Sequence, residues 1–382
     1  MAAAPIRIAI SAPEFSERGA AVGLSGNARI ALQHILPEAR ETLARAGAVP
    51  INSTRIVVGS GPDADTLVAD FDANLAPEDK ELIEHLHPSK KLIKIIQMDS
   101  GIDLAFEDGT TDRLDAVIGA DGIFGSVRRY VLQDEADECA ASPGGWWDSR
   151  VVVPMEKAKS TLGEQYFDVL RQYLWAGDGM FVLHDVLENG TMVQGVISAV
   201  EKDPPANRKR PLTRELLTKA FESWPDGPIS KGIIDLFLDQ PDPQGYSQYE
   251  HKSTPTYSNG RVCIMGDAAH ATTPWQGAGA GQAFEDAVIL GTLLASISSV
   301  EEIYTAFKAH DAVRRPRCQR VVDSSRGTGE IFTGQNKEVG MSLNKLQSAL
   351  AGRWDFLSID LDAHKKEALD MMKKIGVKVP TD

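Results

Sequence analysis

The stretch from Arg261 to Asp286, RVCIMGDAAHATTPWQGAGAGQAFED, constrains the fold of this chain most strongly. The apolar run Val262–Met265 is typical of a short buried strand, and Gly266-Asp267 ends it with turn residues. A glycine-rich loop follows, and behind it apolar residues recur at helical spacing. The pattern predicts a strand ending at Gly266 and a helix starting near Gly279, with Asp267 facing a cleft at the carboxyl end of the strand.

These residue types suit a ligand that carries hydroxyl and phosphate groups. The Asp267 carboxylate can accept hydrogen bonds from ribitol or ribose hydroxyls. Gly277, Gly279 and Gly281 let backbone N–H groups approach a ligand, and they open a helix whose positive end favours anions. The alternative is a glycine-rich helix start without a ligand. The composite of strand, Gly-Asp turn and loop is more specific than a lone G-x-G, and it favours the ligand.

A second pattern of strand, turn and helix lies upstream in Asp115–Arg129, DAVIGADGIFGSVRR. Val117–Ala120 predicts the strand, and the Asp121-Gly122 turn can bring backbone close to a phosphate. Arg128, at the start of the predicted helix, can offer a bidentate fork to such a group. The alternative is a turn whose arginines are ordinary surface residues. The presence of both patterns in this order disfavours that alternative.

The two segments together resemble the FAD fingerprints of the class A flavoprotein monooxygenases, in particular the salicylate-hydroxylase-like aromatic hydroxylases. The resemblance rests on Gly-Asp-Ala-Ala-His with its following Pro and Gly-x-Gly, and on the upstream Asp-Gly. It implies that Asp267 binds the ribityl chain of the flavin and that the Asp121-Gly122 turn serves the pyrophosphate and the pyridine nucleotide. The residues that the resemblance assigns to cofactor binding are Gly19, Ala21, Asp121, Gly122, Arg128, Asp267, Gly277, Ala278, Gly279 and Ala280, with Pro274 and Trp275 near the flavin. It assigns no catalytic side chain and implies no metal.

The chain departs from this family at its N-terminus. The family opens with a strand, a G-x-G-x-x-G loop, a helix and a second strand that ends in a ribose-binding acid. Here Pro5–Ile10 supplies a first strand, but the residues from Ser11 onward resemble the family's segment after the second strand, so that roughly two dozen residues of the βαβ unit are missing. Val57–Ala64 fits G-x-G-x-x-A by letter, but a return strand from Leu67 favours a hairpin. We therefore expect weaker FAD binding than in an intact relative.

These patterns predict an α/β (α+β) fold: a para-hydroxybenzoate-hydroxylase-like FAD-binding domain of Rossmann type, truncated at its N-terminal βαβ unit, with an inserted β-sheet substrate domain and C-terminal helices. Alternation around the Asn189-Gly190 turn, from Met180 to Ala199, predicts a hairpin in the substrate domain. The expected divisions are a discontinuous FAD-binding domain at 1–50, 86–135 and 255–330, a substrate domain at 51–85 and 136–254, and a helical segment at 331–382. In the family, the substrate domain lies over the flavin.

Composition limits the partners of the chain. Its 382 residues include 40 Lys and Arg against 54 Asp and Glu, which gives a net charge of −14. The sequence has no basic run interleaved with aromatic residues, so nucleic acid is not an expected partner. The 3 cysteines form no Cys-x-x-Cys pair, which argues against disulfides and zinc and indicates a reducing compartment. No apolar run approaches the roughly 18 residues of a membrane span, and a signal peptide is not recognised. We expect a cytoplasmic protein with a small aromatic substrate; the sequence leaves the oligomeric state open.

The resemblance implies an FAD-dependent monooxygenase that consumes NADPH or NADH together with O2 and hydroxylates a small phenolic or aromatic acid through a flavin C4a-hydroperoxide. The alternative is a flavin-deficient member of the family, truncated or degenerate, that acts as a binding protein. Six aromatic residues could line the substrate pocket but are more typical of core, so none is assigned to the site: Trp146, Trp147, Tyr166, Tyr173, Trp175 and Phe181. For His270, a local hydrogen-bonding role is favoured over that of a catalytic base.

Overall fold

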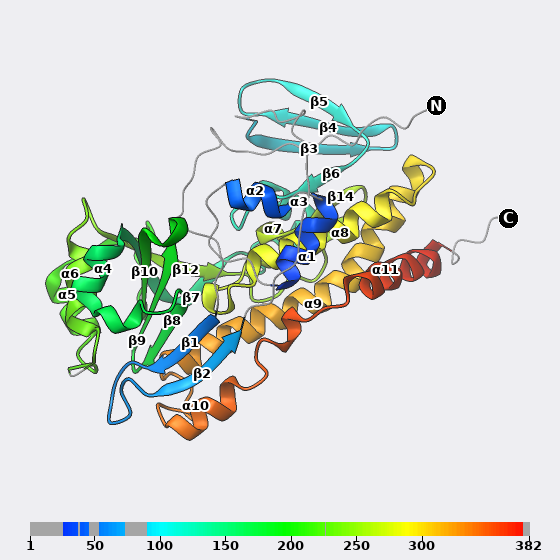
Figure 1. The fold of residues 1–382 in the computed structure, drawn as a ribbon. Coiled ribbons are helices and arrows are strands. Elements are labelled where there is room, and N and C mark those ends of the chain that lie inside the picture. Colours follow the sequence, from blue (N-terminus) through cyan, green and yellow to red (C-terminus); the bar gives the residue numbers. More distant parts are fainter. Residues whose placement is uncertain (1–25, 37–38, 46–52, 73–89, 226, 377–382) are drawn as a thin grey trace.

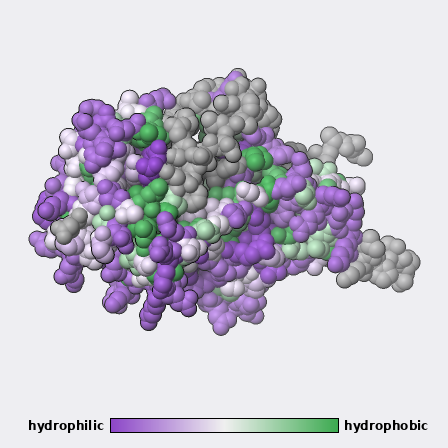
Figure 2. All heavy atoms as spheres, turned by 60° about the horizontal axis from the view of Figure 1, so that its bottom comes forward, coloured by the Kyte–Doolittle hydropathy of each residue, from purple (hydrophilic) through white to green (hydrophobic). Residues whose placement is uncertain are grey.

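The computed structural model describes residues 26–36, 39–45, 53–72, 90–225 and 227–376. Their strands form three sheets, and the longest helix crosses the molecule beneath two of them (Figure 1). On the face that Figure 2 shows, hydrophilic residues form most of the surface and hydrophobic residues gather near its middle. Within these described ranges, no helix combines the length and the apolar character that a membrane span requires. The observed architecture is the mixed α/β type that the sequence predicts.

A three-stranded sheet carries both predicted motifs. Its order is β13 (Ser258–Asn259), β14 (Val262–Ile264) and β6 (Val117–Gly119). One of its faces packs against α3 (Ser126–Leu132) and α7 (Asp267–His270), and the other against α8 (Gly279–Leu294) and α9 (Ile303–Phe332). Because helices cover both faces, the short strands are apolar at successive positions rather than at alternate ones.

An antiparallel meander lies beside this sheet. It consists of β3 (Leu92–Met98), β4 (Gly101–Phe106) and β5 (Thr111–Leu114). Ile102, Leu104 and Phe106 alternate along β4, and all are buried in the cluster that contains α3 and β14. The meander therefore contributes one apolar face to the core that supports the two motifs.

The large sheet has eight strands in the order β11-β12-β7-β10-β9-β8-β1-β2. Their bounds are β1 Ser53–Val58, β2 Leu67–Asp72, β7 Ser142–Pro154, β8 Gln172–Gly177, β9 Met180–Leu187, β10 Met192–Val200, β11 Lys209–Pro211 and β12 Gln244–Glu250. The β9–β10 hairpin confirms the prediction made from Asn189-Gly190. The antiparallel pairing of β1 with β2 confirms that Val57–Ala64 is part of a hairpin.

The two faces of the large sheet pack against different elements. One face is covered by α4 (Met155–Leu162), α5 (Arg214–Ala220) and α6 (Ser230–Leu238), with Trp175 and Trp224 at the centre of the core. The other face packs against the end of α9 and α10 (Leu343–Leu350). All six middle-region aromatic residues are buried, as expected for core: Trp146, Trp147, Tyr166, Tyr173, Trp175 and Phe181.

The remaining helices come from the two ends of the described chain. These are α1 (Gly26–Ile35), α2 (Ala39–Arg45) and α11 (Leu361–Gly376), of which α1 and α11 pack against α8 (Figure 1). The 3-10 turns are η1 Gln133–Glu135, η2 Glu164–Tyr166, η3 Glu188–Gly190, η4 Pro274–Gln276, η5 Val300–Glu302 and η6 Asp355–Leu357. The helices α10 and α11 agree with the helical segment predicted for the end of the chain.

Several predictions fall on residues that the structure does not describe. They concern Gly19 and Ala21 as cofactor-binding residues, the first strand at Pro5–Ile10, and the join between Ile10 and Ser11. The division into domains likewise stays a prediction.

Candidate flavin site

The two motifs meet because their strands are parallel neighbours. In the pairing of β14 with β6, Val262 lies opposite Val117 and Ile264 lies opposite Gly119. The carboxyl ends of parallel strands share one edge of a sheet, so the turns that follow them lie side by side. Asp121 follows β6 and Asp267 follows β14, which agrees with the predicted meeting of the two motifs.

The Gly-Asp turn and the glycine-rich loop place Asp267 beside the N-terminus of α8. The helix begins at Gly279, as predicted, while β14 ends at Ile264, two residues before the predicted end. The strand ends early because Gly266 has φ 57°, outside the extended region. A Cβ built on Gly279 would lie 4.0 Å from Asp267 Oδ1, so the carboxylate adjoins the first turn of α8. Asp267 is exposed, and the cleft it was predicted to face stays a prediction.

Gly277 keeps the loop open next to this carboxylate. Its φ of 61° is in the left-handed region, and a Cβ at this position would meet no atom within 4 Å. No side chain caps the start of α8, so its first N–H groups have no side-chain acceptor among the described residues. A helix start of this kind favours anionic or oxygen-rich groups.

Asp121 organises the other turn. Its Oδ2 accepts a hydrogen bond from the Val127 backbone N–H at 3.1 Å, which satisfies a donor in the first turn of α3. A Cβ on Gly125 would come within 2.1 Å of Asp121 Oδ1, so glycine is required there for the carboxylate to fit. Oδ1 itself is buried without a hydrogen-bond partner in the described part of the chain. This free acceptor can receive a donor from a ligand.

Arg128 lies in the protein interior rather than at the surface. Its Nη1 donates to the carbonyls of Ala268 and Ala269 at 3.1 and 3.0 Å, and its Nη2 donates to the Cys139 carbonyl at 2.8 Å. Burial lowers the pKa of Arg128 to about 10. The side chain therefore ties α3 to the helix that begins with Asp267. Its predicted direct contact with a phosphate stays a prediction.

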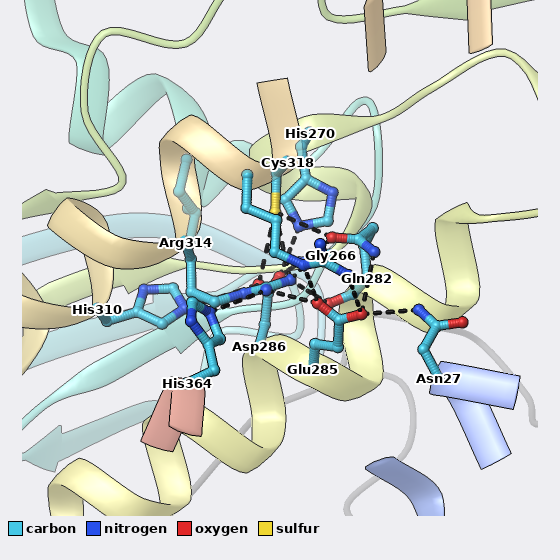
Figure 3. A network of polar contacts seen from close by, with 12 residues as sticks. Asn27, Gly266, His270, Gln282, Glu285, Asp286, His310, Arg314, Cys318 and His364 are labelled. Carbon is cyan, nitrogen blue, oxygen red and sulfur yellow. Dashed lines mark hydrogen bonds and ion pairs between the residues drawn. The ribbon is translucent and has the colours of Figure 1, made fainter. Parts of the chain in front are cut away.

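A buried ionic network between α8 and α9 supports the backbone of the Gly-Asp turn (Figure 3). Asp286 Oδ2 accepts hydrogen bonds from the Gly266 backbone N–H at 2.9 Å and from His270 Nε2 at 2.6 Å. Asp286 Oδ1 accepts from Arg314 Nε at 2.7 Å. One carboxylate thus fixes the backbone immediately before Asp267 and connects α8 to α9.

Glu285 is the second buried carboxylate of this network. Its carboxylate accepts from Arg314 Nη1 at 2.6 Å, from Arg317 Nε at 2.7 Å and from Asn27 Nδ2 of α1 at 2.7 Å. Burial opposes ionisation, but the hydrogen bonds and charges of the two arginines hold the pKa of Glu285 below its usual value. Two carboxylates therefore face two guanidinium groups, and each buried charge has an opposite partner.

His270 has the local hydrogen-bonding geometry that the sequence favoured. Its side chain is buried against Asp286, and although burial disfavours the charged form, Cys318 and Asp286 raise its pKa well above the usual value. Ligand atoms of these three residues lie within 4.8 Å of one another, close enough for a metal. Arg314 donates to Asp286 at 2.7 Å and to Cys318 at 3.4 Å, so a positive charge already occupies their vicinity.

Trp275 connects the loop to the large sheet. Its ring is buried, with ring centroids 5.1 Å from Trp146 and 5.3 Å from Phe181. Its Nε1 has no hydrogen-bond partner in the described residues. The neighbouring Pro274 is exposed. That these two residues adjoin the flavin stays a prediction, but the contacts show that the loop lies against the sheet predicted to bind substrate.

The described half of the site fits the flavin part of FAD. The open position at Gly277, the uncapped start of α8 and the exposed Asp267 together suit a polyol and a flat ring, and the buried Asp121 Oδ1 has no other partner among the described residues. Gly19 and Ala21, the other residues predicted to bind the cofactor, lie outside the described ranges.

Comparison with known proteins identifies the family to which this chain belongs. Residues 102–325 match the family model described as FAD binding domain. The chain is 32% identical to 6-methylsalicylate 1-monooxygenase of Aspergillus terreus, with 96% of this chain and 86% of the relative covered. It is 30% identical to salicylate hydroxylase of Pseudomonas putida, with 94% and 87% covered. The chain belongs to the FAD-dependent monooxygenases. The predicted resemblance is thereby confirmed, and the protein is an FAD-using oxidoreductase.

Solved structures support the same fold. A salicylate hydroxylase substrate complex superposes with a TM-score of 0.73 at 21% identity, covering 95% of this chain and 98% of the other. The structure of CtdE with FAD and a substrate gives 0.77 at 14% identity, covering 97% and 93%. The flavin-hydroxylase fold predicted from the sequence is confirmed.

The large sheet also contains a carboxyl group with an unusual titration. Asp185 of β9 is buried and accepts hydrogen bonds from Gln194 Nε2 at 3.1 Å and Gln172 Nε2 at 3.3 Å. Burial raises the pKa of Asp185 to about 6. A raised folded-state pKa contributes stability at low pH, which is lost as the pH rises through about 6.

The free energy of unfolding of the Asp185→Asn variant, measured relative to that of the wild type, should therefore be higher at pH 8 than at pH 5. About one pKa unit of the shift lies in this interval, which corresponds to about 1.4 kcal/mol. Urea denaturation of both proteins at the two pH values measures the difference. An Asp185→Asn effect that does not change with pH would contradict the raised pKa.

Proposed function

We propose that this FAD-dependent monooxygenase hydroxylates a small phenolic or aromatic acid with NADH or NADPH as reductant. The overall reaction balances as substrate, O2, NAD(P)H and a proton giving hydroxylated product, water and NAD(P)+. The observation that carries the proposal is the contact of Trp275 with Trp146 and Phe181, because it joins the flavin loop to an aromatic sheet face. The printed names of two relatives, 6-methylsalicylate 1-monooxygenase and salicylate hydroxylase, support an aromatic acid.

The site residues would then have the following roles. Asp267 would accept hydrogen bonds from the ribityl hydroxyls, and the residues 277–280 would cradle the flavin ring with their backbone. The Asp121-Gly122 turn would adjoin the pyrophosphate, and Gly19 and Ala21 would complete the cofactor contacts. Bound FAD supplies the electron transfer and the activation of O2.

Arg128 would act through other residues. Its donors hold the Ala268 and Ala269 carbonyls, so it fixes α7, the helix that carries Asp267 at its first position. The buried rings around Trp275 would exclude water from the reacting centre. All three cysteines are free, which supports a cytoplasmic location.

The test combines cofactor binding with product analysis. The purified chain, reconstituted with FAD, should show a flavin spectrum after gel filtration and oxidise NADH or NADPH faster when salicylate or 6-methylsalicylate is present. With ¹⁸O2, the product should contain one labelled oxygen. FAD retention without labelled product from any phenolic acid would contradict the proposed substrate class. Failure to retain FAD at all would support the flavin-deficient alternative, which the comparisons do not favour.

A further inference from the structure

The C-terminal helix α11 has one polar side chain on its buried face. The buried residues of the helix are Leu361, His364 and Ala368, and their spacing places them on one side. Leu361 packs in an apolar cluster with α1 and α8, and Ala368 packs in another with α8 and α9. Apolar contacts thus attach the helix at both positions, and a buried histidine between them is not needed for this attachment.

His364 contacts the guanidinium at the centre of the buried ionic network. Its Nε2 lies 3.4 Å from Arg314 Nη1, and its Nδ1 lies 3.0 Å from Glu367 Oε2. Arginine only donates hydrogen bonds, so Nε2 accepts and Nδ1 carries the proton that is donated to Glu367. Glu367 therefore fixes the neutral ring in the tautomer that Arg314 requires.

His364 accepts the last donor of Arg314. The Arg314 Nε donates to Asp286 at 2.7 Å, and Nη1 donates to Glu285 at 2.6 Å. Nη2 donates to the backbone and side-chain oxygens of Gln282 at 3.1 and 3.0 Å. A guanidinium has five N–H groups, and these contacts leave one of them on Nη1. Loss of the imidazole acceptor would leave this buried donor unsatisfied, which is costly.

The network extends this contact to the turn that carries Asp267. Asp286 accepts from Arg314 with Oδ1 at 2.7 Å and from the Gly266 backbone N–H with Oδ2 at 2.9 Å. Successive hydrogen bonds therefore connect His364 of α11, through Arg314 and Asp286, to the residue directly before Asp267 (Figure 3). The position of the C-terminal helix is linked to the backbone of the candidate flavin site.

We propose that His364 is a positioning residue for FAD, which couples the docking of α11 to the Gly266-Asp267 turn. The inference deepens the proposed function and rests on the contact of Asp267 with the ribityl chain. When α11 is docked, every donor of Arg314 is satisfied, and the guanidinium holds Asp286 against the Gly266 N–H. When α11 leaves, Arg314 loses an acceptor and gains access to water, so the turn loses part of its support.

The surroundings of His364 disfavour its protonated form. From α9, Arg314 and Arg317 contribute two positive charges, and from α8, Glu285 pairs with both of them. On α11 itself, Glu367 is the negative partner of the ring, and its side chain is 61% exposed. Burial and the charge of Arg314 lower the pKa of His364, and Glu367 offsets only part of this effect.

Acid should therefore release α11 from the network. A proton on Nε2 of His364 would place a donor and a positive charge against Arg314. The other two histidines of the network, His270 and His310, face the Asp286 carboxylate instead. Because the folded pKa of His364 is depressed, its contribution is present above the ordinary value of about 6.5 and is lost as the pH falls towards the folded value. Each pH unit in this interval shifts the docking equilibrium by up to about tenfold.

Hydrogen exchange of the full chain without FAD tests the coupling. His364→Gln keeps an acceptor near the position of Nε2 but cannot be protonated, whereas His364→Leu keeps the packing and removes the acceptor. At pH 7.5, the peptide that contains Gly266 should exchange about fivefold faster in His364→Leu than in the wild type or in His364→Gln. At pH 5.5, it should exchange about fivefold faster in the wild type than in His364→Gln. The β9–β10 hairpin, outside this network, should exchange equally in all three proteins.

Titration with FAD connects the coupling to cofactor binding. At pH 7.5, His364→Leu should bind FAD about fivefold more weakly than the wild type, and His364→Gln should retain the wild-type affinity. At pH 5.5, the wild type should bind about fivefold more weakly than His364→Gln. His34→Gln is the matched control: it removes an exposed histidine of α1 that acts on Asp362 of α11, and it should keep the wild-type pH profile.

Three outcomes would overturn the proposal. The first is exchange at Gly266 that is equal in the wild type and both His364 variants at each pH. The second is faster exchange that extends to the β9–β10 hairpin, because this would indicate a general loss of stability. The third is FAD affinity that does not follow the substitutions at His364, or no FAD binding by the folded wild type. Product analysis is separate: His364-dependent FAD binding without a labelled product would contradict the proposed substrate class and leave the coupling supported.

Discussion

Replacement of Arg314 by methionine should destabilise the protein by about 3–5 kcal/mol, because it leaves buried carboxylates without their counter-charge. Arg314 is completely buried, and it donates to Asp286 at 2.7 Å and to Glu285 at 2.6 Å. Methionine has a similar length and preserves most of the packing volume. The loss is therefore electrostatic, and it falls on the network that fixes the Gly266-Asp267 turn.

Urea denaturation at pH 7 measures this effect, and Arg315→Met is the matched control on the same helix. Arg315 pairs with Asp311 at 2.7 Å near the surface, a contact worth only about 0.3–0.5 kcal/mol. The Arg314 effect should shrink in acid. The pKa values of Glu285 and Asp286 are depressed in the folded state, so their contribution is present above the unfolded pKa and is lost as the pH falls through the folded values. A loss below about 1 kcal/mol at pH 7 would show that the pair is dispensable.

The parts of the site that the sequence predicts are those encoded by local residue order. Gly266-Asp267 ends an apolar run and the glycine loop precedes helical periodicity, so the strand, the turn and the start of α8 at Gly279 follow from neighbouring residues. The same holds for Asp121-Gly122. The family resemblance then predicts that the two turns meet, and the parallel pairing of β14 with β6 agrees.

The parts that the sequence does not predict depend on contacts between distant segments. Arg128 has the spacing of a phosphate ligand, yet its partners are carbonyls of residues 139, 268 and 269, which no local pattern identifies. Glu285 and Asp286 were missed as members of an ionic network. A signal was available, since adjacent acids on an apolar helix face require buried cations, and Arg314 and Arg317 are spaced one helical turn apart. The identity of the partners still required the fold.

Replacement of Asp267 by alanine should weaken FAD binding about a hundredfold or more. Two hydrogen bonds from hydroxyls to a carboxylate are worth about 1.5–3 kcal/mol each, and tenfold in affinity corresponds to about 1.4 kcal/mol. Folding should be unaffected, because Asp267 is exposed and its side chain forms no hydrogen bond with the described residues. A loss of FAD affinity without a loss of stability would therefore assign Asp267 to cofactor binding. The Arg314 variant cannot make this distinction, because its substitution changes the stability of the protein.

Quenching of flavin fluorescence during titration gives the dissociation constants. Asp267→Asn keeps one acceptor oxygen beside the start of α8, so it should lie between the wild type and the alanine variant. Glu222→Ala, which removes an exposed acid from the helical layer of the large sheet, controls for the change in net charge. If Asp267→Ala binds FAD as tightly as the wild type, the carboxylate next to Gly279 does not hold the ribityl chain. The uncapped helix N-terminus and the open backbone at Gly277 would then provide the flavin contacts without it.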